Sequence, residues 1–224
     1  PGTEGVYCGN RLMDAIAARR VACETKEEFA AANGLDERPI IALLAGSRRQ
    51  EIDSNFPFMV SLSSRFPDYQ FVVAGVSWLD KNVYERYLTG SNVRYVCDRT
   101  YELLTHSAAA VVTSGTATLE TALLGVPEFV CYRTSSLSYA IAKRFAKVKY
   151  ISLVNLILNR EAVRELIQQD MTPENAEAEL RAILPGGTKH ERLKADYAEL
   201  RRATGESGAS ERTAAEMVRI LKNG

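Results

Sequence analysis

The chain has 224 residues, of which 46% are hydrophobic and 25% charged, a composition typical of a globular protein with a substantial core. Its 28 basic residues balance 28 acidic residues, so no overall charge would attract it to nucleic acid or an anionic membrane. No apolar run approaches the ~20 residues of a membrane-spanning helix, and no basic-then-apolar leader opens the sequence. We therefore expect a protein that is neither exported nor membrane-spanning, and the start at Pro1 without Met suggests a piece of something longer.

The cysteines and histidines give no pattern of a metal site or a disulfide framework. The cysteines lie far apart without a C-x-x-C pair, and only His106 and His190 could assist them. We interpret the cysteines as small hydrophobic residues in a reducing cytosol, and the histidines as structural or solvated. The cysteines are Cys8, Cys23, Cys97 and Cys131.

From Pro39 onward, short apolar runs alternate with longer segments of helical period, which is typical of βαβ units around a parallel sheet. Strands are predicted at residues 40–44, 70–74, 93–96, 109–112, 128–131 and 149–151. Helices are predicted at about 52–66, 79–88, 101–106, 117–124 and 137–145. The expected fold class is α/β, a Rossmann-like parallel sheet with helices on both faces, followed by C-terminal helices.

The two ends of the chain differ from this middle part. The first 38 residues predict a loop, a helix at 12–19 and a polar connection around 25–33. From about residue 160 the sequence predicts helices without further strands, at 161–168, 173–184, 190–202 and 211–222. The last two carry single apolar stripes, and each stripe needs something to pack on. We divide the chain into a lead-in at 1–38 from a missing domain, a sheet domain at 39–184, and terminal helices at 185–224 that would pack on another domain or a partner chain.

A first candidate anion site follows the predicted strand 40–44. Gly46, Ser47 and Arg48 lie between that strand and a helix, at the carboxyl edge where open α/β sheets bind ligands. Gly46 lets the backbone approach a phosphate, Ser47 can donate or cap, and Arg48 offers a planar fork for an anion. An ordinary strand-to-helix turn capped by Ser47 explains these residues equally well.

A second turn, at residues 113–120, has more polar groups than helix capping requires. Its backbone amides and hydroxyls suit a diphosphate, and Glu120, about one turn into the helix, could accept both hydroxyl protons of a ribose. The alternative is a helix start with an acidic residue placed against the helix dipole. Both turns belong to one sheet edge, which favours a shared ligand site. The candidate residues are Ser114, Gly115, Thr116, Thr118 and Glu120.

Several common motifs are absent from the sequence. Neither turn has the glycine pattern of a P-loop or a dinucleotide-binding fingerprint, which disfavours an ATPase or a nicotinamide enzyme. There is no Asp-x-Asp pair to hold a cation on a diphosphate. We expect no metal and no cofactor, with an arginine, hydroxyls and helix dipoles stabilising a leaving group instead.

Two further features have both a structural and a functional interpretation. Asn155 is the one amide in an apolar stretch at 151–157, and when buried it must bond to backbone, the more common case, or to a ligand. A basic patch interleaved with apolar residues fits either a solvated helix face or contact with anionic lipid. The patch is formed by Lys143, Arg144, Lys147 and Lys149.

The order and spacing of these motifs resemble the lipid-A-disaccharide synthase family across most of the chain. The stretch from Lys147 to Leu153, with the sequence KVKYISL, is close to specific for that family, whereas the two turns resemble those of several related transferases. The matching segments are 43–52 (LLAGSRRQEI), 114–120 (SGTATLE), 125–127 (GVP), 132–133 (YR) and 142–157 (AKRFAKVKYISLVNLI).

The resemblance implies a two-domain hexosyltransferase of the GT-B fold. Such an enzyme transfers 2,3-diacylglucosamine from its UDP derivative to lipid X, 2,3-diacylglucosamine 1-phosphate, and gives the lipid A disaccharide 1-phosphate and UDP. This chain would be the C-terminal, UDP-binding domain, with most of the N-terminal domain and its general base missing.

The resemblance also places the parts of UDP on this sequence. The turn at 46–48 would face the diphosphate, with Arg48 stabilising the leaving group, and the turn at 114–118 would complete the cradle. Glu120 would hold the ribose, the loop at 96–99 would meet the uracil, and Asn155 would border the pocket. The implied UDP contacts are Gly46, Ser47, Arg48, Val96, Cys97, Asp98, Ser114, Gly115, Thr116, Thr118, Glu120 and Asn155.

The sequence departs from the family pattern at four positions. Ala45 and Val154 stand where the family has prolines, and Asn159 and Arg164 stand where it has a glycine and a proline. Proline fixes φ and restricts its predecessor, so its loss affects the rigidity of these turns more than their chemistry.

The resemblance further implies the behaviour of this chain. Since catalysis needs both domains to meet across a cleft, we expect the chain alone to bind UDP weakly and to lack transferase activity. It is expected in the cytoplasm, peripheral to the inner membrane, with UDP-diacylglucosamine, lipid X and the missing domain as partners and no nucleic acid. The last helix, which usually crosses back to the first domain in this fold, makes a homodimer plausible.

Two rival interpretations follow from the same residues. The nearest is another UDP-sugar enzyme of this architecture, such as the peptidoglycan N-acetylglucosaminyltransferase or a UDP-N-acetylglucosamine 2-epimerase, which products from acylated and unacylated donors would distinguish. A non-catalytic nucleotide-sugar-binding module belongs to a different class. An upstream reading frame that encodes a second sheet domain would exclude it.

Overall fold

A six-stranded parallel sheet organises the protein. The computed structural model describes residues 24–113, 115–133 and 149–205. The strand order is β3-β2-β1-β4-β5-β6, and every pairing is parallel. The strands are β1 (Ile40–Leu44), β2 (Gln70–Gly75), β3 (Arg94–Cys97), β4 (Ser107–Val112), β5 (Glu128–Tyr132) and β6 (Glu165–Ile167). The order reverses between β1 and β4, so this neighbouring pair marks the edge where doubly wound sheets bind ligands.

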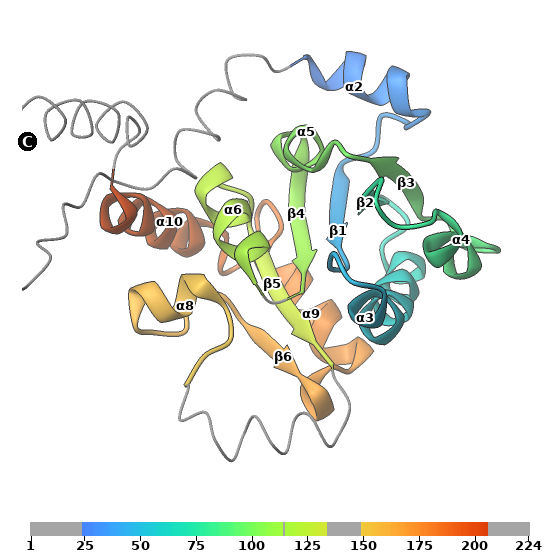
Figure 1. Cartoon of the computed structure of the whole chain (residues 1–224). Helices are drawn as coiled ribbons and strands as arrows, with labels where there is room; N and C mark the ends of the chain where they lie inside the picture. Colours follow the sequence, from blue (N-terminus) through green and yellow to red (C-terminus); the bar gives the residue numbers. More distant parts are fainter. Residues whose placement is uncertain (1–23, 114, 134–148, 206–224) are drawn as a thin grey trace, which may run out of the picture.

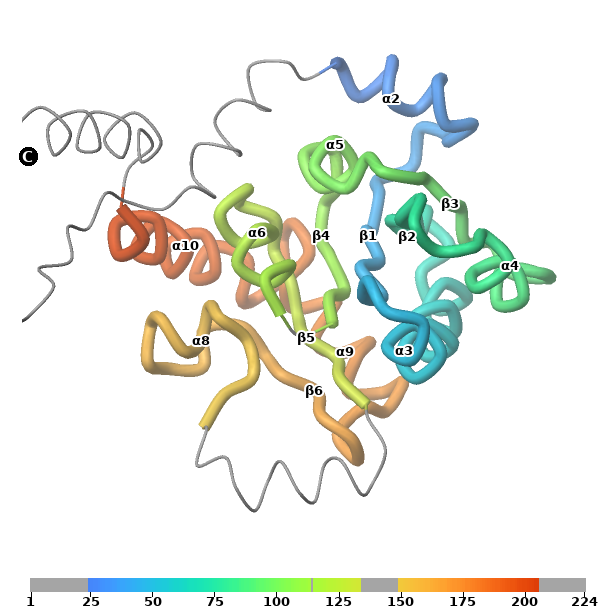
Figure 2. Tube along the Cα trace, viewed as in Figure 1, coloured from blue at the N-terminus to red at the C-terminus, as the bar shows by residue number. Residues whose placement is uncertain are grey.

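Helices cover both faces of this sheet, as Figures 1 and 2 show. One layer joins α3, α4 and α9, with α9 packed on the 3₁₀ turn that follows α3, and the other joins α5, α6, α8 and α10. Because both faces are covered, β1 is buried at every position. The helices are α2 (Lys26–Asn33), α3 (Arg49–Ser61), α4 (Asn82–Leu88), α5 (Thr100–Thr105), α6 (Thr116–Leu124), α8 (Leu153–Leu158), α9 (Pro173–Ile183) and α10 (His190–Thr204).

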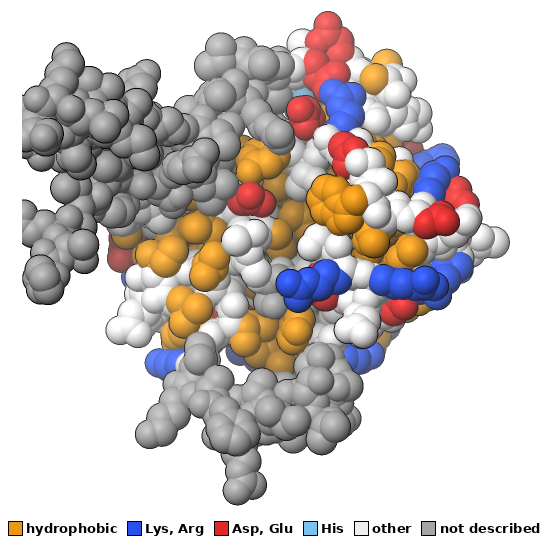
Figure 3. Space-filling view, in the orientation of Figure 1, with side chains coloured by type: hydrophobic (Ala, Val, Ile, Leu, Met, Phe, Trp, Pro, Cys, Tyr) orange, Lys and Arg blue, Asp and Glu red, His pale blue; other side chains and the backbone are white. Residues whose placement is uncertain are grey.

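The expected α/β class is therefore confirmed, with the first five strands close to their predicted positions. None of the described helices could span a bilayer. On the face drawn in Figure 3, basic and acidic side chains are interspersed over the described surface, with apolar side chains between them. The predicted helices at 12–19, 137–145 and 211–222 lie outside the described residues.

The sixth strand corrects two expectations. A helix was expected at 161–168, yet residues 165–167 form β6 beside β5. Val163 and Leu166 are buried there, so pairing with the sheet outweighs local helix preference. The weak strand expected at 149–151 is instead an irregular approach to α8.

A helix replaces the polar connection expected around 25–33. Thr25 caps α2, because its hydroxyl accepts the Glu28 N–H at 3.2 Å and the Glu28 carboxylate accepts the Thr25 N–H at 2.8 Å. This reciprocal pair is a capping box, and its polar residues resemble a loop in composition. Phe29 anchors the helix in the core.

The first of the two terminal helices packs on the sheet domain itself. The stripe of Leu193, Tyr197 and Leu200 on α10 is buried, and α10 contacts α6, α8 and α9. For this helix the structure differs from the expectation that residues 185–224 pack on another domain or a partner chain. Residues 206–224 lie outside the described part of the chain.

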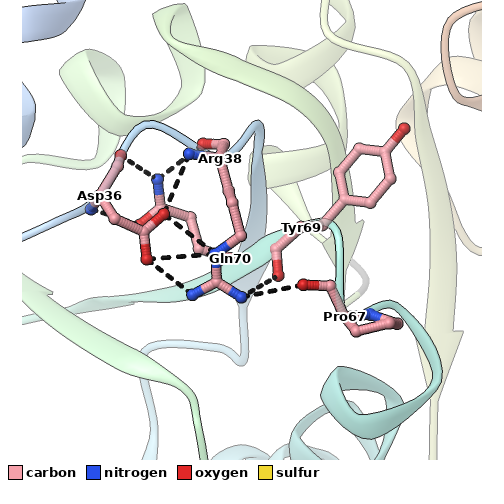
Figure 4. A network of polar contacts seen from close by, with 5 residues as sticks. All are labelled: Asp36, Arg38, Pro67, Tyr69 and Gln70. Carbon is pink, nitrogen blue, oxygen red and sulfur yellow. Dashed lines mark hydrogen bonds and ion pairs between the residues drawn. The ribbon is translucent and has the colours of Figure 1, made fainter.

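A polar network holds the starts of β1 and β2 together, at the edge opposite the candidate turns (Figure 4). Arg38 pairs with the Asp36 carboxylate at 2.7 Å and donates to the carbonyl oxygens of Pro67 and Tyr69 at 3.0 and 3.3 Å. The Gln70 amide donates to the carbonyl oxygens of Asp36 and Arg38, both at 2.7 Å. These bonds satisfy backbone groups that enter neighbouring strands and stabilise the pairing of β1 with β2.

Glu128, the first residue of β5, is an unusual core residue. Its side chain is fully buried, and both carboxylate oxygens lack a hydrogen-bond partner among the described residues. Only its backbone is satisfied nearby, where its N–H donates to the Tyr197 hydroxyl at 3.2 Å. Burial raises the pKa of the Glu128 carboxyl well above its ordinary value, because an apolar environment disfavours the charged form.

This burial predicts a pH dependence of stability. Between the ordinary value of 4.5 and the raised folded value, the folded state binds one more proton than the unfolded state. The free energy of unfolding should therefore fall as the pH rises above 4.5, by about 1.4 kcal/mol per pH unit within that window. Glu128→Gln, which cannot ionise, should lack this part of the fall, whereas Glu27→Gln on the exposed face of α2 should keep it. Urea unfolding across the pH range measures this difference, and parallel curves for Glu128→Gln and wild type would contradict it.

Candidate functional site

The turn after β1 presents its polar groups at the carboxyl edge of the sheet. Gly46 has φ 107°, a conformation that favours glycine. Ser47 and Arg48 are exposed, and α3 begins at the next residue, so the positive end of the helix faces the same region. The described geometry brings the three predicted residues together.

Glu51, in the first turn of α3, holds this turn from the helix side. Its Oε2 atom accepts the Ser47 N–H at 3.1 Å and the Arg48 N–H at 3.3 Å. A Cβ atom on Gly46 would lie 2.6 Å from the same oxygen, so only glycine fits while Glu51 occupies this position. One carboxylate thus fixes the backbone on which the Arg48 side chain stands.

The turn after β4 lies directly beside the first one. Leu44 pairs with Val112 across β1 and β4, and Thr113 donates from its N–H and its hydroxyl to the Leu44 carbonyl oxygen at 3.0 and 3.1 Å. Beyond Thr113, Gly115 has φ 120°, and Thr116 is exposed at the start of α6. Two helix N-termini with adjacent amides form a suitable site for an anion.

The hydroxyl of Thr118, in the second turn, is used inside the protein. Ser114 lies outside the described residues. The Thr118 hydroxyl is buried, donates to the Gly115 carbonyl oxygen at 2.9 Å and accepts the Leu153 N–H at 3.3 Å. Thr118 therefore links α6 to α8, and its side chain supports the turn from inside.

Glu120 lies half-buried on α6, within reach of α5. The Tyr101 hydroxyl donates to its Oε1 atom at 2.9 Å, which orients the carboxylate and leaves further acceptor positions on both oxygens. The arrangement suits an acceptor of ribose hydroxyl protons, because a carboxylate can accept two of them.

The turn after β3 joins the turn after β2. Val96 is buried, whereas Cys97 and Asp98 are exposed. Asp98 has φ 55°, and its Oδ1 atom accepts the Ser77 N–H at 2.9 Å. Hydrogen bonds from Ser77 hold the pKa of the Asp98 carboxyl below its ordinary value. A uracil contact at this turn stays a prediction, with backbone groups and Cys97 as the accessible candidates.

Asn155 acts as an internal clamp. It is fully buried, its Oδ1 atom accepts the N–H groups of Ala162 and Val163 at 2.8 and 2.9 Å, and its amide donates to the Val163 carbonyl and the Glu165 carboxylate. Glu165 also accepts from the Ser152 N–H and hydroxyl. The contacts favour the structural interpretation, and Asn155 would act on a ligand only through the segment that it holds.

Little of the predicted basic patch can be placed. Lys143, Arg144 and Lys147 lie outside the described residues, whereas Lys149 is exposed, with its Nζ atom 5.1 Å from the centre of the Tyr150 ring. Among the described residues, no three His, Cys, Asp or Glu side chains are grouped to hold a metal ion.

Four side chains near these turns were missed as site residues by sequence reasoning. Glu51 and Tyr101 hold predicted residues, and Trp78 donates its indole N–H to the Ser47 carbonyl oxygen at 3.3 Å. Asn55, buried on α3, accepts the Arg133 N–H at 2.7 Å and so fixes the end of β5. The sequence did contain a signal for Glu51, because it stands three residues after Arg48, which is the spacing of a capping box. The roles of Tyr101, Trp78 and Asn55 depend on tertiary contacts.

Comparison with known proteins gives a consistent match. The family model described as lipid-A-disaccharide synthetase matches residues 2–219. A lipid-A-disaccharide synthase of Anaeromyxobacter dehalogenans (strain 2CP-C) is 37% identical over 98% of this chain and 59% of its own length. One from Myxococcus xanthus (strain DK1622) is 34% identical over 100% of this chain and 59% of its own length. The chain thus spans about 59% of the length of these relatives.

Solved structures with lower sequence identity share the fold. A UDP-GlcNAc 2-epimerase from Neisseria meningitidis bound to UDP-GlcNAc aligns with a TM-score of 0.59 and 17% identity, over 95% of this chain and 54% of that one. The ADP-heptose lps heptosyltransferase II of E. coli aligns with a TM-score of 0.53 and 18% identity, over 72% of this chain and 51% of that one. These similarities show the Rossmann-like α/β fold of this part of the protein, and the sequence match establishes that this chain belongs to the lipid-A-disaccharide synthetase family.

Proposed function

We propose that this chain is the UDP-binding part of a lipid-A-disaccharide synthase. In the proposed reaction, 2,3-diacylglucosamine passes from its UDP derivative to 2,3-diacylglucosamine 1-phosphate, and UDP is released. The observation that carries the proposal is the side-by-side position of two strand-to-helix turns, after β1 and β4, joined by the bonds from Thr113 to the Leu44 carbonyl. A diphosphate between them would meet two helix N-termini.

The described residues suggest how the leaving UDP would be stabilised. Negative charge grows on the diphosphate as the bond to the sugar breaks, and Arg48 together with the amides of both turns would offset it. Glu120, oriented by Tyr101, would hold the ribose. In this mechanism the Arg48 guanidinium would supply the positive charge beside the diphosphate.

The acidic side chains around these turns are engaged in other bonds. Glu51 accepts from backbone amides, Asp98 from Ser77 and Glu120 from Tyr101. The family resemblance implies that the general base lies in the part of the enzyme that this chain does not span, and these three carboxylates would orient the turns and the ribose instead. Peripheral contact with the inner membrane, through Lys143, Arg144, Lys147 and Lys149, and a homodimer are further parts of this proposal.

Arg48 and Arg49 provide a matched test of the diphosphate site. Arg48→Ala should raise the Kd for UDP about 10-fold or more, because a charge-assisted hydrogen bond is lost. The Arg49 side chain is 68% exposed, and its Nε atom lies 3.9 Å from Oδ2 of Asp53. Arg49→Ala should therefore change the Kd for UDP by no more than about 2-fold. Isothermal calorimetry on the 224-residue chain measures both values. Equal effects of the two substitutions would contradict a specific diphosphate contact, and no UDP binding by this chain or by the intact protein would refute the site.

The proposed role of Glu120 predicts that the chain prefers a ribose over a 2′-deoxyribose. Wild type should bind UDP about 10-fold more tightly than 2′-deoxy-UDP, since the carboxylate accepts the 2′-hydroxyl proton. Glu120→Ala should remove most of this preference, while Glu85→Ala on the exposed face of α4 should retain it. Competition titrations measure the ratio of the two dissociation constants. A preference that survives in Glu120→Ala would show that another group reads the ribose.

Activity assays test whether this chain alone can transfer the sugar. The 224-residue chain should bind UDP yet transfer no sugar between acylated glucosamine substrates, because the resemblance places the acceptor site and the general base in the part of the relatives that this chain does not span. Thin-layer analysis of radiolabelled product would detect transfer. Disaccharide formation by this chain alone would contradict the proposed absence of a general base.

A further inference from the structure

Trp78 is the only tryptophan of the chain, and it is exposed. The residue is 69% accessible, the highest value among the exposed large hydrophobic residues of the described part of the chain. It stands in the short connection between β2 and α4, at the same edge of the sheet as the two candidate turns. A large aromatic surface left in water beside a ligand site is typical of a recognition surface.

The indole is held in place despite its exposure. Its Nε1–H group donates to the Ser47 carbonyl oxygen at 3.3 Å, while the Ser47 N–H donates to Glu51 at 3.1 Å. The connection that carries Trp78 is tied to the turn after β3, because Asp98 accepts the Ser77 N–H at 2.9 Å. Trp78 therefore borders the turn at 46–48 on a backbone fixed from two sides.

The strand order places Trp78 away from the proposed ribose contact. The turn after β1 lies between the turns after β2 and β4. Glu120 lies on the β4 side, in the layer of α5 and α6, whereas Trp78 lies on the β2 side and leads into α4, in the layer of α3. The predicted uracil loop at 96–99 leads directly into α5, where Tyr101 bonds to Glu120, so the nucleoside would lie on the side of α5 and α6. With the diphosphate at 46–48, a sugar that continues across this turn would reach the indole on the other side.

We propose that Trp78 contacts the acylated sugar of the donor and sets the preference for acylated over unacylated UDP-glucosamine. This inference rests on the proposed function, because it takes UDP to bind between the two turns. A flat indole face suits the apolar C–H face of a pyranose and the first carbons of an acyl chain, and polar groups of UDP gain little from it.

Substitutions of Trp78 can separate a contact with the donor sugar from the hydrogen bond that its N–H group makes to Ser47. Trp78→Ala should reduce the preference for a diacylated donor over UDP-N-acetylglucosamine about 10-fold, as expected when an aromatic contact is truncated. It should leave the Kd for UDP nearly unchanged. Trp78→Phe keeps an aromatic face but loses the N–H donor, so it should retain most of the preference. Leu156→Ala, at a 43% exposed position on α8, is the control for loss of an exposed apolar side chain.

The single tryptophan also reports binding directly. We would titrate the 224-residue chain with UDP, UDP-N-acetylglucosamine and a UDP-2,3-diacylglucosamine with short acyl chains, kept below its critical micelle concentration. Calorimetry would measure binding, and intrinsic fluorescence would monitor Trp78. The diacylated donor should shift the emission to shorter wavelength as the indole leaves water, and UDP alone should not.

Each other outcome would overturn the inference in a distinct way. If Trp78→Ala raises the Kd for UDP as much as the Kd for the diacylated donor, the indole acts on the nucleotide or on the turn at 46–48. If UDP binds but Trp78→Ala changes no affinity and no ligand shifts the emission, Trp78 does not contact the donor. If calorimetry shows binding of none of the three ligands, the proposed function fails, and this inference fails with it.

Discussion

The parallel pairing of β1 with β4 is the constraint on which the candidate site depends. Consecutive strands β1, β2 and β3 extend the sheet in one direction, and β4 returns to the other side of β1. This reversal sets the helix starts of α3 and α6 side by side. Thr113 then ties the two strand ends together through the Leu44 carbonyl. An anion held at one turn is therefore within reach of the other.

Side chains, more than prolines, hold these turns in shape. Ala45 and Val154 stand where the family resemblance implies prolines, and both neighbouring segments are fixed by buried or half-buried polar groups. Glu51 holds the amides of the first turn, and Asn155 clamps the segment after α8. Asn159, in place of a glycine, adopts φ 50° at the end of α8, which asparagine tolerates better than most residues. The substitutions are thus compatible with an ordered site.

Much of this architecture could be predicted from periodicity, because short apolar runs that alternate with helical segments leave few arrangements other than a parallel sheet. The edge strand β6 could not, since three residues are too few to show alternation and its neighbours have helical spacing. The helix α2 was hidden by the polar composition of its capping box. Within the site, Gly46, Ser47, Arg48 and Glu120 follow from their position after strands, whereas Trp78 depends on a contact that only the folded chain creates.

A structure of this chain with UDP bound tests the account most directly. We predict that the diphosphate lies between the turn at 46–48 and the start of α6, with Arg48 on its oxygens and the ribose hydroxyls at Glu120. Density for UDP away from both turns would contradict it.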